Sequence, residues 1–230
     1  MASADLAGAV DFIANMHFPF TRSQRPSIYA ALSLPQLNML DDRLSALLMS
    51  YNLDNRLISV FTKLTRFSQA VDFALTPVPI EPLAFVADIF EIQSELLSNL
   101  EPDSYELDVL SLREALRMGA LIFMKDIAQE YPLALLGSTN LVQRMKNALS
   151  SILDIKKYAP LRLLFMGGIS SKKSIDRVWF MAHLVKALPK QSTWEDVRRA
   201  LKSVLWIEKL QGDHCKNLWE EVKITRAINC

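Results

Sequence analysis

The amino-acid sequence predicts an all-α protein, a single globular multi-helix domain that covers residues 1–230. Three observations favour this fold class. Apolar residues recur at three- and four-residue steps through most of the chain, which is the period of one helix face. No stretch of four to eight residues alternates cleanly between apolar and polar side chains, as a half-buried strand would. The chain has only 6 glycines, and this scarcity disfavours hairpin-rich β architectures.

Composition and charge narrow the class of protein. Half of the residues are hydrophobic and 22% are charged, which argues against disorder, and 230 residues suit one large domain with a sizeable core. The formal net charge of +1 does not indicate nucleic-acid binding, which needs clustered lysine and arginine. The two cysteines, Cys215 and Cys230, exclude a disulfide framework and are expected to be intracellular thiols. The N-terminus lacks a basic region and carries Asp5 and Asp11, so it does not resemble a signal peptide.

Helical periodicity first appears in three segments, at residues 37–51, 57–75 and 83–100. Each segment repeats large apolar side chains at spacings that place them on one helix face, and that face needs a partner to bury against. The three sets are Leu37, Leu40, Leu44, Leu47, Leu48 and Tyr51; Leu57, Val60, Phe61, Leu64, Val71 and Leu75; and Leu83, Val86, Phe90, Leu97 and Leu100.

A longer helix is predicted at residues 105–131. It is apolar almost all round, so we expect it to lie centrally with neighbours on several sides. The apolar run at residues 115–124 is interrupted by Arg117 and is too short to span a bilayer, so we expect no membrane contact. The main stripe is Leu112, Leu116, Phe123 and Ile127, with Met118, Leu121 and Ile122 on the other faces.

Prolines and polar residues predict where these helices end. Pro77, Pro79 and Pro82 in TPVPIEP interrupt the chain between the second and third helices. Residues 101–104 end the third helix and offer Asp103 or Ser104 as the N-cap of the long one. A loop follows the long helix, bounded by Pro132 and Gly137.

Two further boundaries are predicted in the last third of the chain. Ser192 and Glu195 have capping-box spacing, in which the Ser192 hydroxyl accepts from the backbone N–H of Glu195 and Glu195 reaches back. Gly212 and Asp213 fit a C′ glycine followed by an N-cap aspartate, which would end one helix and begin another.

Histidine and cysteine spacing predicts no metal site and no bound cofactor. The histidines are His17, His183 and His214, and only His214 has a neighbouring ligand, Cys215. Adjacent residues on a helix do not face the same way, so this pair makes a poor zinc site. His183 lies in a mostly apolar segment, where we expect a hydrogen-bonded core histidine.

Glycines, serines and acidic pairs give no catalytic constellation. Gly167-Gly168 fits no phosphate-binding loop, and is expected to let two backbones approach or to break the helix before Ser170-Ser171. These serines lie in no nucleophile elbow. Asp41-Asp42 and Glu220-Glu221 are expected on solvated helix surfaces. We therefore predict no catalytic residue and no enzymatic activity.

Charged pairs and short motifs give no binding patch either. Basic pairs occur at Lys156-Lys157, Lys172-Lys173 and Arg198-Arg199, and none extends to a run of five. The segment LSALL at residues 44–48 fits the L-x-x-L-L pattern of some coactivators, but core packing explains it better. The 9 methionines and 11 phenylalanines could line an adaptable pocket, although core packing is favoured for them too.

The last third of the chain carries the functional signal. Residues 161–184 are LRLLFMGGISSKKSIDRVWFMAHL, residues 193–209 are TWEDVRRALKSVLWIEK, and residues 218–222 are LWEEV. Trp179, Trp206 and Trp219 are expected to be core anchors on successive capped helices. This block resembles the end of the fungal-specific transcription factor regulatory domain, the middle homology region of zinc binuclear cluster proteins. Residues 111–124, SLREALRMGALIFM, fit the preceding helical section of that family more loosely.

The resemblance implies an all-α fold, localisation in the nucleus and regulation of transcription, commonly of metabolic or secondary-metabolite gene clusters. The family binds DNA through an N-terminal cluster of six cysteines and two zinc ions, whereas no cysteine precedes Cys215 here. We therefore expect no direct nucleic-acid binding. We expect action through protein partners, such as the transcription machinery or a DNA-binding factor, or through a small-molecule effector. The chain is either a stand-alone regulatory domain or a fragment of a longer factor.

Two other functions stay open at the level of sequence. An all-α biosynthetic enzyme of a fungal gene cluster would need a paired acidic motif for Mg²⁺, and Asp41-Asp42 is the nearest match. A helical scaffold would stack helix pairs into a superhelix, although the sequence shows no fixed internal period.

Overall fold

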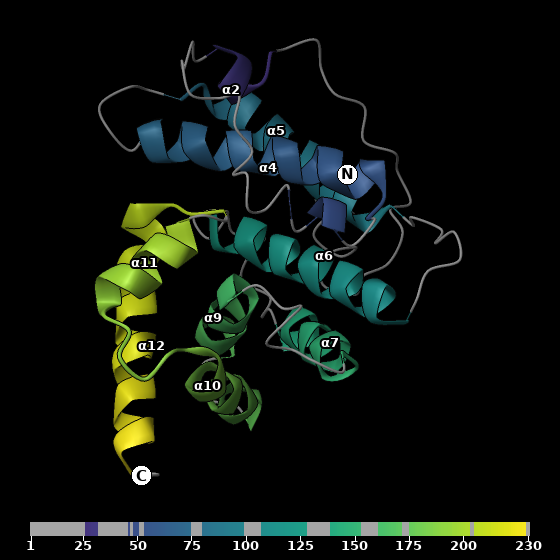
Figure 1. Cartoon of the computed structure of the whole chain (residues 1–230). Coiled ribbons are helices and arrows are strands. Elements are labelled where there is room, and N and C mark those ends of the chain that lie inside the picture. The colour runs from purple at the N-terminus through teal and green to yellow at the C-terminus, as the bar shows by residue number, and fades with distance from the viewer. Residues whose placement is uncertain are drawn as a thin grey trace.

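Helices make up nearly all of the described residues in the computed structural model shown in Figure 1. The structure describes residues 26–31, 46, 48–50, 53–74, 80–98, 107–127, 139–152, 161–171, 175–202 and 205–228. None of these residues lies in a strand, so the predicted all-α class is confirmed. The helices are α2 (Ile28–Ala31), α4 (Asn55–Ala74), α5 (Pro82–Leu97), α6 (Leu107–Ile127), α7 (Thr139–Ser150), α9 (Leu161–Ser170), α10 (Ile175–Ala187), α11 (Trp194–Lys202) and α12 (Glu208–Ile228).

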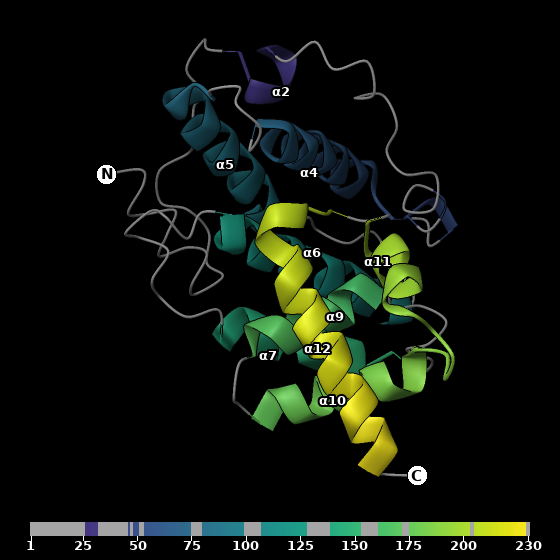
Figure 2. The same ribbon diagram turned by 90° about the vertical axis from the view of Figure 1, so that its left-hand side faces the viewer.

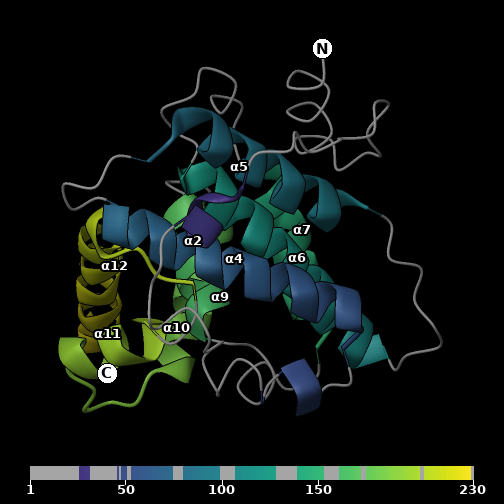
Figure 3. The same ribbon diagram turned by 90° about the horizontal axis from the view of Figure 1, so that it is seen from above.

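The long helix α6 lies at the centre of the molecule, as its all-round apolar sequence predicts. Every residue from 118 to 125 is buried. Helices α4 and α5 pack on one side of α6, and α7, α9 and α10 lie on the other (Figures 1 and 3). One hydrophobic core runs through both sides. Among the described helices, none is long and apolar enough to cross a membrane.

The segments of the C-terminal block fold next to one another as α9, α10, α11 and α12. Figure 2 shows α12 running across α9 and α10. The two glycines of α9 permit this packing, because a Cβ atom on Gly167 would lie 2.2 Å from a ring carbon of Phe180. A Cβ atom on Gly168 would lie 2.8 Å from Leu218. The expectation that this pair allows close approach is therefore supported, with side chains meeting the backbone of α9. The alternative of a helix break is wrong, since α9 continues through both glycines to Ser170.

The N-terminal helix boundaries use acidic caps. The Leu57 N–H donates to Asp54 Oδ1 at 2.8 Å, which caps α4. The Glu81 side chain accepts from the Ala84 N–H and caps α5. Pro82 does not lie in the interruption before α5, as the sequence suggests, but occupies its first turn. A proline fits there because the missing N–H would have no partner within the helix.

Two boundaries of the last third differ from the prediction. The capping box belongs to Thr193 and Asp196: the Asp196 N–H donates to Thr193 Oγ1 at 3.2 Å, and the Thr193 N–H donates to Asp196 at 3.0 Å. Ser192 instead donates its hydroxyl to the Pro189 carbonyl. Gly212 ends no helix, because α12 runs unbroken from residue 208 to residue 228.

The tryptophans serve as anchors to different degrees. Trp206 and Trp219 are buried, whereas Trp179 is only half-buried and packs edge-on against Phe180. Trp206 does not lie on a helix, since Leu205 and Trp206 belong to the connection between α11 and α12. Leu205 has a φ of 42°, in the left-handed region that is strained for a branched side chain. The prediction that Trp206 lies on a helix is therefore wrong.

Candidate functional site

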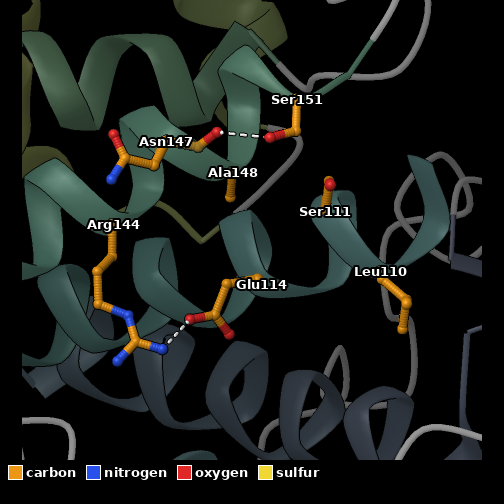
Figure 4. A pocket seen from close by; sticks show the side chains of 7 residues that line it. All are labelled: Leu110, Ser111, Glu114, Arg144, Asn147, Ala148 and Ser151. Atoms are coloured by element: carbon orange, nitrogen blue, oxygen red, sulfur yellow. Dashed lines mark hydrogen bonds and ion pairs between the residues drawn. The ribbon is translucent and has the colours of Figure 1, made fainter. Parts of the chain in front are cut away.

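A groove of about 380 Å³ lies between α6 and α7 and is open to the surface (Figure 4). Each helix presents one face to it, because residues three, four and seven positions apart lie on the same side of a helix. The lining consists of Leu110, Ser111 and Glu114 from α6, and Arg144, Asn147, Ala148 and Ser151 from α7 and the turn that follows it.

The charges at one end of the groove leave an excess of positive charge. Glu114 binds two arginines: its Oε1 accepts from Arg144 at 2.6 Å and its Oε2 accepts from Arg117 at 3.2 Å. Burial lowers the pKa of Arg117, an effect that Glu114 opposes and that the nearby Arg144 and Arg113 reinforce. One carboxylate therefore faces two guanidinium groups, since Arg113 has its own partner in Asp54 at 2.9 Å.

The other end of the groove carries two hydroxyl groups. Ser111 is only 8% exposed, and its hydroxyl has no hydrogen-bond partner among the described residues. The Ser151 hydroxyl donates to the backbone carbonyl of Asn147 at 3.1 Å. Figure 4 shows Arg144 and Glu114 pointing toward one another at one end and the two serines at the other. The arrangement can hold a small molecule with a negative group at one end and a hydrogen-bonding group at the other.

Sequence reasoning missed this groove, because it predicted the helix at residues 105–131 only as a central helix with neighbours on several sides. One signal could have indicated part of it. Glu114 and Arg117 are charged residues within an otherwise apolar helix, and such positions must reach either a partner or the surface. Arg144 could not have been connected with them, because it lies 30 residues from Glu114 in the sequence.

The described candidates from the sequence lie apart from one another. His214 is exposed while Cys215 is buried, which confirms that the two do not share a face. His183 is hydrogen-bonded as predicted, with its Nδ1 at 2.8 Å from the Trp179 carbonyl oxygen, but it is half-buried and not a core residue. No group of three metal-ligating side chains occurs within the described ranges.

The serine and charged pairs serve local structure. The Ser171 hydroxyl donates to the Gly168 carbonyl at 3.1 Å, while the buried Ser170 hydroxyl has no partner among the described residues. Glu221 binds Arg177 with both oxygens, which joins α12 to α10. Glu220 pairs with Lys223 on the surface.

Several sequence candidates lie outside the residues that the structure describes. They are His17, Asp41-Asp42, Leu44 and Leu47 of the L-x-x-L-L segment, Pro77, Pro79, Asp103, Ser104, Pro132, Gly137, Lys156-Lys157, Lys172-Lys173 and Cys230.

A buried arginine connects α9 with α12. Arg162 donates to the side-chain oxygen of Gln211 and lies 3.7 Å from Cys215 Sγ. Its guanidinium also lies over the Trp206 ring, 5.1 Å from the centroid. Burial lowers the pKa of Arg162 and raises that of the Cys215 thiol. A thiol whose pKa is raised by burial is a poor nucleophile, so this cluster is structural.

The connection from α11 to α12 converges on one carboxylate. Glu208 accepts from Trp206 Nε1 at 2.8 Å and pairs with Arg198 at 3.0 Å and Lys202 at 2.9 Å. Its backbone N–H donates to Asp72 on α4 at 3.1 Å. This junction fixes the start of α12 against both its own connection and the N-terminal part of the molecule.

An apolar stripe is exposed on α10. Ile175 and Val178 are 82% and 68% exposed, and Ala182, also exposed, continues the same face. The stripe ends at the exposed Lys186. The three apolar positions therefore share one exposed face of this helix.

We compared the chain with protein-family models, curated proteins and solved structures, and none of them matches it. The resemblance of the C-terminal block therefore stays a prediction from its residues.

Proposed function

We propose that this protein regulates transcription through contacts with protein partners, as a regulatory domain of the fungal zinc-cluster type that acts in the nucleus. One observation carries the proposal. The residues that give the C-terminal block its resemblance contact one another in space: Gly167 packs on Phe180, and Gly168 packs on Leu218. Residues that carry the resemblance and also pack against one another form one structural unit. This supports the proposed relation of the domain to that family.

The stripe on α10 (Ile175, Val178 and Ala182) supports action through a partner. Exposed apolar residues that share one helix face are typical of protein–protein contact sites. The spacing suits an amphipathic helix of the partner, laid along α10. Lys186 ends the stripe with a positive charge, so we expect an acidic residue at the matching end of that helix.

A tethering experiment tests the proposal. The full chain is fused to a heterologous DNA-binding domain in a fungal reporter strain, and reporter transcript is measured against the DNA-binding domain alone. We expect transcript to change several-fold in either direction. The double variant Ile175→Glu, Val178→Glu should abolish the change at equal protein level, because two charges on the stripe oppose docking of an apolar helix face.

The matched control places the same charge elsewhere. Ile224 on α12 is also an exposed apolar residue, 60% accessible, and lies outside the stripe. We expect Ile224→Glu to leave the reporter response intact. A fusion that leaves transcript unchanged, together with an unchanged transcriptome on deletion of the gene, would contradict the proposal.

DNA binding by the chain alone is tested separately. The described arginines and lysines of α10, α11 and α12 include several that are paired with carboxylates, such as Arg177, Arg198 and Lys202. Neutralised charges contribute little to phosphate binding. A mobility-shift assay with purified protein should therefore show no sequence-selective complex at physiological salt, and tight selective binding would overturn this part.

A further inference from the structure

The α6–α7 groove combines two features that point to a ligand. The first is charge: Glu114 neutralises only one of the two arginines that it binds. Arg144 is 45% exposed and uses one of its N–H groups on Glu114, while a guanidinium has five. The remaining donors are free to bind a carboxylate, which is the group that the planar guanidinium fork matches best.

The second feature is a hydroxyl at the other end of the groove that has no protein partner. Ser111 is more than nine-tenths buried and lines the groove, yet its hydroxyl forms no hydrogen bond to any described residue. Because this oxygen opens into the groove, water reaches it, and a ligand hydroxyl can take the place of that water. Ala148 lies between this hydroxyl and the arginine end, and Leu110 adds apolar surface beyond Ser111 (Figure 4).

The length of the groove limits the size of the ligand. Arg144 on α7 and Ser151 in the turn that follows it are seven residues apart, which corresponds to about 10.5 Å at the rise of an α-helix. A single benzene ring with substituents at opposite positions fits this length when a hydrogen bond of about 2.8 Å is added at each end. The volume of about 380 Å³ lies in the range of small-ligand sites.

We propose that the α6–α7 groove binds a small organic anion, with its carboxylate on Arg144, its apolar body over Ala148, and a hydroxyl at Ser111. The binding site stands independently of the proposed function. The role of its ligand as an effector rests on that function, because a ligand that bridges α6 and α7 would act on the helices behind them through the shared core.

The test uses two probes that differ in charge alone. 4-Hydroxybenzoate carries the carboxylate and the distant hydroxyl, and 4-hydroxybenzamide replaces the carboxylate with a neutral amide. Purified full chain labelled with ¹⁵N is titrated with each probe up to about 10 mM, tenfold above a millimolar Kd. We expect saturable shifts of backbone amides in α6 and α7 with the benzoate, and binding at least about tenfold weaker with the benzamide.

Two variants should change the affinity in opposite directions. Arg144→Gln removes the carboxylate partner and should weaken benzoate binding about tenfold. Glu114→Gln removes the competing carboxylate while both arginines stay, so it should strengthen binding severalfold. Because loss of structure would weaken binding in both variants, the opposite signs distinguish a ligand site from a structural ion pair. Arg199→Gln serves as the matched control, since Arg199 is also an exposed arginine paired with a carboxylate, that of Asp196, but lies on α11.

The outcomes separate the two proposals. Equal affinity for both probes, shifts confined to other helices, or no binding at about 10 mM would each overturn the ligand site. If the two variants change benzoate affinity in the expected directions while tethering leaves transcript unchanged, the ligand site is retained and the proposed function is rejected.

Discussion

Gly167 and Gly168 determine, at the scale of single residues, how closely α10 and α12 approach α9. Neither glycine is needed for backbone conformation, because both are helical and have negative φ. They are needed for space. The Phe180 ring lies against one and the Leu218 side chain against the other. The positions are therefore fixed by packing, in contrast to Gly212, which faces only the flexible carboxylate of Glu208.

This contrast predicts that alanine at the two positions changes the stability of the protein in opposite directions. Gly167→Ala should destabilise the protein by about 1–3 kcal/mol, because the added methyl group would lie 2.2 Å from the Phe180 ring, which must move. Gly212→Ala should instead stabilise it by up to about 1 kcal/mol, since alanine favours the helix and the nearest atom is the carboxylate oxygen at 3.1 Å. Urea denaturation followed by circular dichroism measures both. Equal effects would show that helix propensity, and not packing, controls the two sites.

Helix α11 shows, at the scale of elements, how a cap fixes a boundary. Thr193 and Asp196 bond reciprocally, and these hydrogen bonds lower the pKa of the Asp196 carboxyl. We expect Thr193→Ala to destabilise the protein by about 1 kcal/mol, the usual cost of losing an N-cap. Ser192→Ala, one residue earlier, should have little effect, because that hydroxyl is exposed and bonds only the Pro189 carbonyl. Thermal unfolding distinguishes the two, and a larger loss for Ser192→Ala would place the cap there.

The junction at Glu208 predicts a dependence on pH. Partial burial raises the pKa of Glu208, but hydrogen bonds from Lys202, Trp206 and Arg198 outweigh this effect, and the pKa is lower than usual. A carboxyl whose pKa is lowered by folding stabilises the protein above its unfolded pKa, near about 4.3, and loses this contribution as pH falls through its folded value.

The corresponding variant is Glu208→Gln, which keeps the shape of the side chain without its charge. Glu208 is partly exposed to solvent, so at pH 7 we expect a modest loss, about 0.5–1 kcal/mol. The difference from the parent protein should shrink below about pH 4, where the parent is protonated too. Glu220→Gln, which removes a surface pair with Lys223, should change stability little at either pH. A loss for Glu208→Gln that stays constant down to pH 3 would show that charge is not its cause.

The shared core predicts, at the scale of the whole molecule, that the helices unfold together. The buried residues of α4 and α5 belong to the same hydrophobic cluster as those of α9 and α12, with α6 between them. We expect tryptophan fluorescence, which reports on the 4 tryptophans, all in the C-terminal part of the chain, to change at the same urea concentration as helical circular dichroism. Two separated transitions would indicate that the parts on either side of α6 fold independently.

The sequence predicted those features that depend on local periodicity. The central place of α6 followed from its apolar faces, and the ends of α4 and α5 lie close to the predicted ones. The cap of α11 was displaced by one residue, because Ser192/Glu195 and Thr193/Asp196 have the same chemistry and the same spacing. Gly212-Asp213 looked like a break, but burial of Gln211 and Cys215 on either side holds α12 in one piece. The groove depends on packing between α6 and α7, which local patterns do not specify.

The buried Arg162 has a consequence for the register of α12. Its guanidinium meets Gln211 and Cys215, which lie one helical turn apart. If α12 were shifted along its axis by one turn, Trp219 would take the place of Cys215, or Ile207 the place of Gln211. The buried guanidinium would then lose one polar neighbour, with no water to replace it. An apolar side chain at position 162 would lack this requirement, because apolar contacts have no preferred direction. We therefore expect the charge to select one alignment of the C-terminal helix among several of similar packing, so that Arg162→Met would leave a helical protein whose α12 amides show more than one set of NMR signals.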